Sequence, residues 1–454
     1  MGENKGVQGR VIESDKFLIE EFKKNINSIK FLKRLTKNQI KKLKDEVPFN
    51  YQSTELKDLW KNMVGNSIVF LKGKDEREII HDQMMLGVGK IHKYLEEYEN
   101  FEKILYGTID NYREHIIHVF RTYILGDYLI RNNFGYSKID IEYGKYPISK
   151  EEKEAMWCII ALCHDLGYPL EKIHELNDPI RKILKIFGPI SINEFGFNFF
   201  PQFTEISNFT IKFMSSTIQE KKLGKKKYSK IIHLQPKYYL KFTSALTNYN
   251  HGIMSSILLM KDLVYFKESD YALDDYKELS DHDFRHFLIR REILRSIASH
   301  DCSDIYYLNV TNFQFLLKAF DEMQEWGRPR LKDITKRGGT ETKLVINKFT
   351  ETEVNYNIVF KFPNKYGEMA SEEEKKGTKE EIEEYFEIKC SEWMNVLRSA
   401  VLGIDNNARK LTVIFTVEDL IDTPVTYSLE HKNSKEFNIE PKKIKTKILK
   451  EKLF

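Results

Sequence analysis

The stretch WCIIALCHDLGYP, which spans Trp157–Pro169, decides the fold of this chain. Residues 157–163 are apolar on every face of a helix, which predicts a fully buried helix. The Gly and Pro that follow are typical helix terminators, so the helix should stop close to His164 and Asp165. It then directs an imidazole and a carboxylate into the interior, where buried polar groups need partners such as a metal ion. The alternative is a helix end that His164 caps while Asp165 accepts from backbone N–H groups.

Three further histidine motifs each lie beside an apolar helical segment. In the first, apolar residues at helical spacing place His118 on the buried side and predict a ligand. His115 lies one turn earlier on the same face, where it suits a substrate contact or a hydrogen bond to a ligand. The other two motifs are Asn250–Gly252, which opens an apolar helix, and Ser299–Asp301, which closes one. Each of these histidines could instead be a satisfied core residue or a helix cap.

Asp321 lies in a further apolar segment, where a lone carboxylate would be costly without a counter-ion. Imidazole and carboxylate are ligands that suit Mn, Fe, Co, Ni or Zn, so the whole series indicates a metal-dependent hydrolase. The predicted metal ligands are His118, His164, Asp165, His251, His300 and Asp321.

This order of ligands resembles the HD superfamily of metal-dependent phosphohydrolases, over roughly residues 110 to 330. The most specific segments are 161–169, 250–252 and 321–329. The resemblance implies a mainly α fold, in which an HD-type helical bundle holds one or two divalent ions. It implies a transition metal (Mn, Fe, Co, Ni or Zn), with Mg as a further option. The Tyr168-Pro169 that follows the doublet departs from members with a Lys or His nearby, so the proton donor to the leaving group stays unassigned.

Carried over residue by residue, the resemblance assigns the ligands common to the superfamily to His118, His164, Asp165 and Asp321. His251 and His300 match the additional pair of members with two metals, in which Asp165 would bridge the ions. Two ions lower the pKa of a bridging water and clamp the oxygens of a phosphoryl group. With one ion, His251 and His300 would be free to act as acid and base. The catalytic candidates are therefore Asp165, His251 and His300.

Cations surround these motifs, as a phosphorylated substrate requires. Guanidinium groups bind phosphate through two parallel hydrogen bonds, and Tyr168, Tyr249 or Trp326 could offer a flat face to a base. Any of the cations could instead be a surface charge, and any of the aromatic residues could belong to the core. The predicted substrate contacts are His115, Arg121, Lys172, Tyr168, Arg291, Arg295 and Arg328.

Composition bounds the remaining possibilities. The 454 residues are enough for two or three domains. With 72 Lys and Arg against 68 Asp and Glu, the net charge of +4 is too balanced to indicate a nucleic-acid partner. The four Cys have no paired-ligand spacing, which is typical of the reducing cytoplasm. No signal peptide or long apolar run is recognisable, so we expect a cytoplasmic protein without a membrane partner.

We expect three domains along the chain. Residues 1–105 have helical spacing and predict a lead-in that packs on the bundle, and residues 106–334 form the HD phosphohydrolase domain. Residues 335–454 predict a small α+β module for oligomerisation or effector binding. Its predicted strands are 343–349, 355–362, 411–417 and 425–429, with a helix over 382–400. The segment 187–233 is less regular and contains a lysine cluster, which predicts a solvated loop or a lid.

The leading functional hypothesis is a metal-dependent nucleotide phosphohydrolase. Most specifically, we expect a homo-oligomeric deoxynucleoside triphosphate triphosphohydrolase that releases triphosphate, in antiviral defence or nucleotide-pool control. The close alternative is a phosphodiesterase for cyclic mono- or dinucleotides, which the additional histidines favour. A metal-dependent single-strand nuclease and a nucleotide sensor without turnover are further alternatives.

Overall fold

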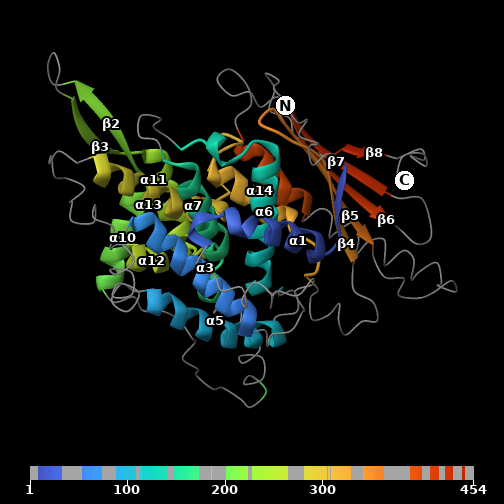
Figure 1. Cartoon of the computed structure of the whole chain (residues 1–454), viewed down its shortest axis with the longest axis horizontal. Coiled ribbons are helices and arrows are strands. Elements are labelled where there is room, and N and C mark those ends of the chain that lie inside the picture. Colours follow the sequence, from blue (N-terminus) through green and yellow to red (C-terminus); the bar gives the residue numbers. More distant parts are fainter. Residues whose placement is uncertain are drawn as a thin grey trace.

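The computed structural model describes most of the bundle and parts of both ends of the chain. The described residues are 9–32, 54–73, 88–108, 113, 115–141, 148–172, 186, 201–222, 228–263, 281–303, 305–306, 308–328, 341–361, 389–400, 410–418, 425–432 and 442–444. Within them the protein is mainly helical, with a six-stranded sheet against one side of the bundle and a separate two-stranded hairpin (Figure 1). The predicted mainly α class is therefore correct.

Helix α7 (Lys150–Cys163) lies at the centre of the bundle and is buried from Ala155 to Cys163. A capping box starts it: the Ser149 hydroxyl accepts from the backbone N–H of Glu152, whose carboxylate accepts from the backbone N–H of Ser149. The turn at 164–167 and the short helix α8 (Tyr168–Glu171) follow. The predicted buried helix and its end before the His-Asp pair are both confirmed.

Four helices pack closely around α7. They are α3 (Thr54–Lys72), α6 (Ile116–Asn133), α13 (Asp281–His300) and α14 (Phe313–Met323). The approach of α6 to α7 depends on Gly126, because a Cβ there would lie 2.1 Å from Cζ2 of Trp157. The indole N–H of Trp157 in turn donates to the Tyr123 carbonyl on α6 (3.2 Å).

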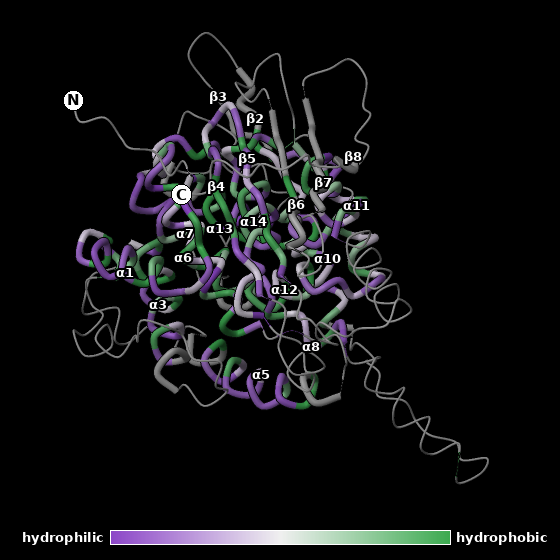
Figure 2. The backbone as a smooth tube through the Cα atoms, turned by 90° about the vertical axis from the view of Figure 1, so that its right-hand side faces the viewer, coloured by the Kyte–Doolittle hydropathy of each residue, from purple (hydrophilic) through white to green (hydrophobic). Residues whose placement is uncertain are grey.

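Five further helices of the described part cover this centre. They are α1 (Asp15–Asn25), α5 (Val88–Thr108), α10 (Pro201–Met214), α11 (Pro236–Thr247) and α12 (His251–Leu263). Figure 2 shows hydrophobic segments gathered in the middle of the molecule, with more hydrophilic stretches on the outer helices α1 and α5. None of the described helices is both long and apolar enough to cross a membrane.

The main sheet has the strand order β1-β4-β5-β6-β7-β8. Its strands are β1 (Arg10–Ile12), β4 (Glu341–Phe349), β5 (Glu353–Lys361), β6 (Lys410–Glu418), β7 (Val425–Lys432) and β8 (Lys442–Ile444). Neighbours are antiparallel except β5 and β6, which are parallel and are connected through a helix at 389–399. All four predicted strands are therefore present, although residue 362 and the predicted helical residues 382–388 lie outside the described part.

The sheet packs on the bundle through aromatic side chains. Phe349 of β4 contacts Phe320 of α14 (ring centroids 5.4 Å apart) and Phe134, which follows α6 (6.1 Å). The helix at 389–399 packs on the same sheet through Trp393, which contacts Tyr356 of β5 (4.9 Å). Strand β1, from the start of the chain, pairs with β4 and so completes the sheet. One hydrophobic core accordingly includes residues from all three predicted domains.

The lysine-rich segment is more regular than its composition predicts. Strands β2 (Ser216–Lys222) and β3 (Tyr228–Leu234) form an antiparallel hairpin that extends away from the helices (Figure 1). The connecting residues 223–227, which include three of the clustered lysines, lie outside the described part.

Candidate metal centre

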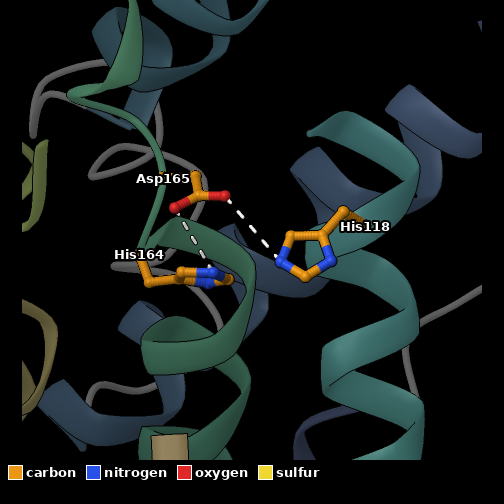
Figure 3. A group of neighbouring side chains, drawn as sticks. All are labelled: His118, His164 and Asp165. Atoms are coloured by element: carbon orange, nitrogen blue, oxygen red, sulfur yellow. Dashed lines mark ion pairs between the residues drawn. The ribbon is translucent and has the colours of Figure 1, made fainter. Parts of the chain in front are cut away.

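The six predicted ligands come together where five helices end or begin. His118 lies in the first turn of α6, and His164 and Asp165 follow α7. His251 is the first residue of α12, His300 is the last of α13, and Asp321 lies in the last turn of α14. Figure 3 shows His118 and His164 facing the Asp165 carboxylate from two neighbouring helices. Residues far apart in the sequence thus converge on one carboxylate.

The first group of donors surrounds Asp321. Its Oδ1 lies 2.6 Å from Nε2 of His118 and 3.5 Å from Nε2 of His164. The same His164 nitrogen lies 3.4 Å from Oδ1 of Asp165, whose Oδ2 lies 3.9 Å from Nε2 of His118. His118, His164 and Asp165 lie close enough together to hold one metal ion, and so do His164, His300 and Asp321.

The second group of donors lies on the other side of Asp165. Nε2 of His251 and Nε2 of His300 are 2.9 Å apart. They lie 3.4 Å and 3.6 Å from Oδ1 of Asp165. His251, His300 and Asp165 could also hold an ion. Asp165 therefore belongs to two groups of donors, as a ligand that bridges two ions must.

Each of the four imidazoles directs Nδ1 away from the cluster toward an acceptor. The contacts are His118 with Oε1 of Gln324 (2.5 Å), His164 with the Ala161 carbonyl (2.8 Å), His300 with the Ile297 carbonyl (2.6 Å) and His251 with Oε2 of Glu171 (2.7 Å). An acceptor at Nδ1 keeps the proton there and leaves the Nε2 lone pair for a metal. Nε2 of His164 is buried and has no hydrogen-bond partner among the described residues. The donor set therefore fits a divalent ion.

The charges around the cluster shift several pKa values. Burial, together with the positive charge of Arg328, lowers the pKa of His118 to about 4. Burial would also lower the pKa of His251, but Asp301, Glu171 and Asp165 offset it and raise this pKa to about 10. Burial opposes ionisation of Asp165, yet the histidines around it hold its pKa well below the usual range. Burial would lower the pKa of His164 too, but Asp165 and Asp321 offset it and raise this pKa. Without an ion, ionised Asp165 thus lies among imidazoles of different basicity, of which His251 holds a second proton at neutral pH and His118 does not.

Exposure differs among the side chains of the site. The side chains of His118, His164, His300 and Asp165 are at most 7% exposed. In contrast, Asp321, Glu171 and Asp301 are 23%, 24% and 25% exposed. These three carboxylates are therefore the more exposed part of the site, which we call its mouth.

Two of the predicted substrate contacts line the cluster. His115 is the N-cap residue of α6, and its Nε2 lies 3.8 Å from Oδ2 of Asp165. Its ring packs on that of Tyr168, with centroids 3.9 Å apart. Lys172 also lies beside Tyr168: its Nζ is 5.3 Å from the centroid of the Tyr168 ring and 3.1 Å from Oε1 of Glu171.

Arg328 is the second cation near the mouth. Its charge contributes to lowering the pKa values of His115 and His118, in both cases after burial. It follows the turn that begins after α14, and its side chain is half-buried. Lys172 and Arg328 are therefore the predicted phosphate contacts that the structure places beside the cluster.

The three other predicted arginines are buried against protein groups. Arg121 pairs with Asp15 of α1 through Nε (2.7 Å) and Nη2 (2.8 Å). Arg295 donates to the carbonyls of Met214 (2.7 Å) and Ser216 (2.6 Å) at the base of the β2–β3 hairpin, and Arg291 also reaches Ser216 (3.3 Å). The structure does not bring these arginines to the metal centre, because buried guanidinium groups are committed to acceptors from neighbouring helices and strands.

The aromatic residues considered for a base also differ. Trp326 is 1% exposed, and its indole N–H donates to Asp15 (2.9 Å), so it belongs to the core. Tyr249 precedes α12 with a positive φ of 54° and is half-buried. Only Tyr168 is placed against the cluster by a described ring contact.

Sequence reasoning missed the residues that orient the ligands. Gln324 follows Asp321 by three positions, and Asp301 directly follows His300. Glu171 accepts from both Nδ1 and the backbone N–H of His251, at 2.7 Å and 2.9 Å. Their only signal is a polar side chain next to a predicted ligand, which many surface residues share. Glu171, His251 and Asp301 also lie close enough together to form a further group of possible ligands.

Comparison of the chain with protein families, with curated proteins and with solved structures gave no match. The functional assignment therefore rests on the geometry and chemistry of the site.

Proposed function

We propose that this chain is a metal-dependent phosphohydrolase that acts on a nucleotide. The observation that carries this proposal is the convergence of four Nε2 atoms on the carboxylates of Asp165 and Asp321, with each Nδ1 held by an acceptor. A first ion would be held by His118, His164, Asp165 and Asp321. A second would be held by His251 and His300, with Asp165 shared between the two. The resemblance of the ligand order to the HD superfamily supports the same assignment.

The residues of the chain would divide the work as follows. When bound, divalent ions would supply an acidified water and neutralise charge on phosphoryl oxygens. Asp165, buried and ionised, would be shared by the two donor groups and would fix the distance between them. Lys172 and Arg328 would bind anionic oxygens of the substrate at the mouth. His115 and Tyr168 would line the wall on which a base or sugar rests. If only one ion binds, His251 and His300 would be free to serve as acid and base.

Among nucleotides, a deoxynucleoside triphosphate cleaved to nucleoside and triphosphate is the first candidate, as the sequence predicts. A cyclic nucleotide or dinucleotide is the second candidate, and one observation favours it. Three of the predicted arginines are engaged inside the protein, while the mouth carries Glu171 and Asp301 beside Lys172. A phosphodiester carries a single charge and requires fewer cations than a triphosphate. Assembly into a homo-oligomer remains a prediction.

The test is a product analysis with metal-loaded protein. The chain is incubated with Mn²⁺ and, separately, with deoxynucleoside triphosphates, cyclic mono- and dinucleotides and single-stranded DNA, and the products are resolved by ion-exchange chromatography. Triphosphate identifies the first candidate, and a monophosphate or linear dinucleotide identifies the second. Asp165→Ala should abolish turnover and metal uptake, because it removes the shared ligand.

The matched control is Asp58→Ala, which removes an exposed carboxylate from α3, away from the centre. It should leave metal content and turnover unchanged. An Asp165→Ala protein that keeps both metal and turnover would show that the centre is wrongly assigned. A wild-type protein that binds metal without cleaving any of these substrates would support the sensor alternative instead.

A further inference from the structure

The turn that follows α14 determines how one metal ligand is held. Oε1 of Gln324 faces Nδ1 of His118 at 2.5 Å, and Nε2 of Gln324 donates to the Trp326 carbonyl at 2.7 Å. The second contact fixes which end of the amide is the acceptor. With its proton held on Nδ1, His118 would offer the lone pair of Nε2 to a metal ion beside Asp321, whose Oδ1 lies 2.6 Å away. Any displacement of this turn changes the orientation of His118.

Glu325, the next residue in the turn, is held from two sides. Its Oε2 accepts from Nη2 of Arg113 at 2.7 Å, and its Oε1 accepts from Nζ of Lys389 at 2.8 Å. The side chains of Glu325 and Lys389 are 3% and 8% exposed, so these charges interact with little screening by water. Burial opposes ionisation of Glu325, but the two cations offset it and lower its pKa below the ordinary value. The turn is thus fixed by a buried ionic clamp.

Lys389 comes from the C-terminal module, and not from the bundle. It begins the described part of the helix at 389–399, which connects the parallel strands β5 and β6. This helix is attached to the sheet through the contact of Trp393 with Tyr356, and to the bundle side through the Leu308 N–H, which donates to the Ser399 carbonyl (2.8 Å). The helix therefore contacts both the sheet and the bundle, and its position determines where the ammonium of Lys389 is placed.

We infer that Lys389 is a positioning residue for the metal centre, which acts through Glu325 and Gln324 on His118. The inference rests on the proposed metal-binding function and adds a role for the C-terminal module. That module holds the turn that orients a ligand, so its packing against α14 sets how tightly the metal is retained. Without the ammonium, a buried carboxylate loses one of its two cations and the turn loses this contact with the module.

The experiment measures metal binding, so that it does not depend on identifying a substrate. Wild type, Lys389→Met and Lys389→Arg are titrated with Co²⁺ against a chelator, and the visible absorption of bound Co²⁺ is recorded. Loss of groups that orient a ligand typically weakens metal binding by about 10- to 100-fold, and we expect about 10-fold for Lys389→Met because it acts through two intervening residues. Its Co²⁺ spectrum should also change. Lys389→Arg keeps the charge and should restore most of both properties.

The matched control is Lys348→Met, which removes an exposed lysine of β4, in the same C-terminal module, that pairs with Glu353 (2.7 Å). It should bind Co²⁺ as wild type does. If Lys389→Met does not fold, Glu325→Gln replaces it, since the amide keeps the shape of the side chain but loses its charge. Wild-type affinity and spectrum in the folded variant would overturn the inference, as would an equal loss in Lys348→Met. Wild-type protein that takes up no Co²⁺ would instead overturn the proposed function, and the inference with it.

Discussion

Arg121 provides the sharpest test of the structure against the sequence, because the two assign it different roles. It lies one turn after His118, which predicts a phosphate contact, yet its guanidinium is directed at α1 and at the turn after α14. We predict that Arg121→Met weakens folding and leaves substrate affinity per folded molecule unchanged. Methionine keeps most of the apolar length of the side chain, so the change chiefly removes the charge.

The size of the effect follows from the contacts. The side chains of Arg121 and Asp15 are 5% and 3% exposed and are joined by two hydrogen bonds of 2.7 and 2.8 Å. A third bond, from Nη1, reaches the Gly327 carbonyl at 2.6 Å. Arg121→Met leaves the Asp15 carboxylate buried with the indole N–H of Trp326 as its remaining hydrogen-bond donor among the contacts described above. Removing one partner of a buried ion pair costs roughly 3–5 kcal/mol, so we expect a loss in that range.

A double-mutant cycle separates the ion pair from packing. Arg121→Met, Asp15→Leu and the double variant are unfolded in urea at a fixed metal concentration, and the free energies of unfolding are compared. Each single variant leaves one unpaired buried charge, whereas the double variant leaves none. The double variant should therefore lose less stability than the sum of the two single variants.

The opposite pattern would refute the structural role of Arg121. If Arg121→Met loses less than about 1 kcal/mol, as for an exposed pair, while the KM for the cleaved nucleotide rises, Arg121 contacts the substrate. A strictly additive cycle would show that Arg121 and Asp15 do not interact in solution.

Two further predictions concern the core and the metal. Gly126→Ala should destabilise the protein by about 1–3 kcal/mol, measured by urea unfolding, because the new Cβ would overlap the Trp157 ring; an unchanged midpoint would mean that α6 and α7 are farther apart than described. Metal removal by a chelator should lower the thermal midpoint, and added Mn²⁺ should raise it with concentration in wild type but not in Asp165→Ala, because an ion that binds only the folded state stabilises it by mass action. A rise in both proteins would place the responsible ion elsewhere.

Local patterns were sufficient to predict the helices and strands that frame the site. Residues 157–163 are apolar on all faces, and the structure buries each of them. The alternating strands β4 and β5 were likewise predicted to within a few residues of their observed ends. Each candidate ligand was identified because a polar side chain beside a buried helix needs a partner, and the structure brings all six together. Periodicity and burial are local properties, and they can therefore be deduced from local sequence.

Partners from distant segments could not be deduced in this way. The pairing of β1 with β4 joins residues 10–12 to residues 344–346, and nothing in either segment identifies the other. The same holds for Lys389 and Glu325, whose contact depends on how the module packs on the bundle. Gln324 and Glu171 are ordinary polar residues until the fold places an imidazole against them.

Arg291 and Arg295 differ from these cases, because their sequence context already argues against the prediction that they bind phosphate. The sequence predicts that Ser299–Asp301 closes an apolar helix, and Arg291 and Arg295 lie inside that helix. A guanidinium cannot lose its proton near neutral pH, so a buried one must find acceptors within the protein. In the folded chain those acceptors are carbonyls at the base of the β2–β3 hairpin. A cation on a wholly buried helix is therefore better assigned to holding a neighbouring element than to binding a ligand. By the same reasoning Lys172 and Arg328, which are only partly buried, are the cations to test for phosphate binding.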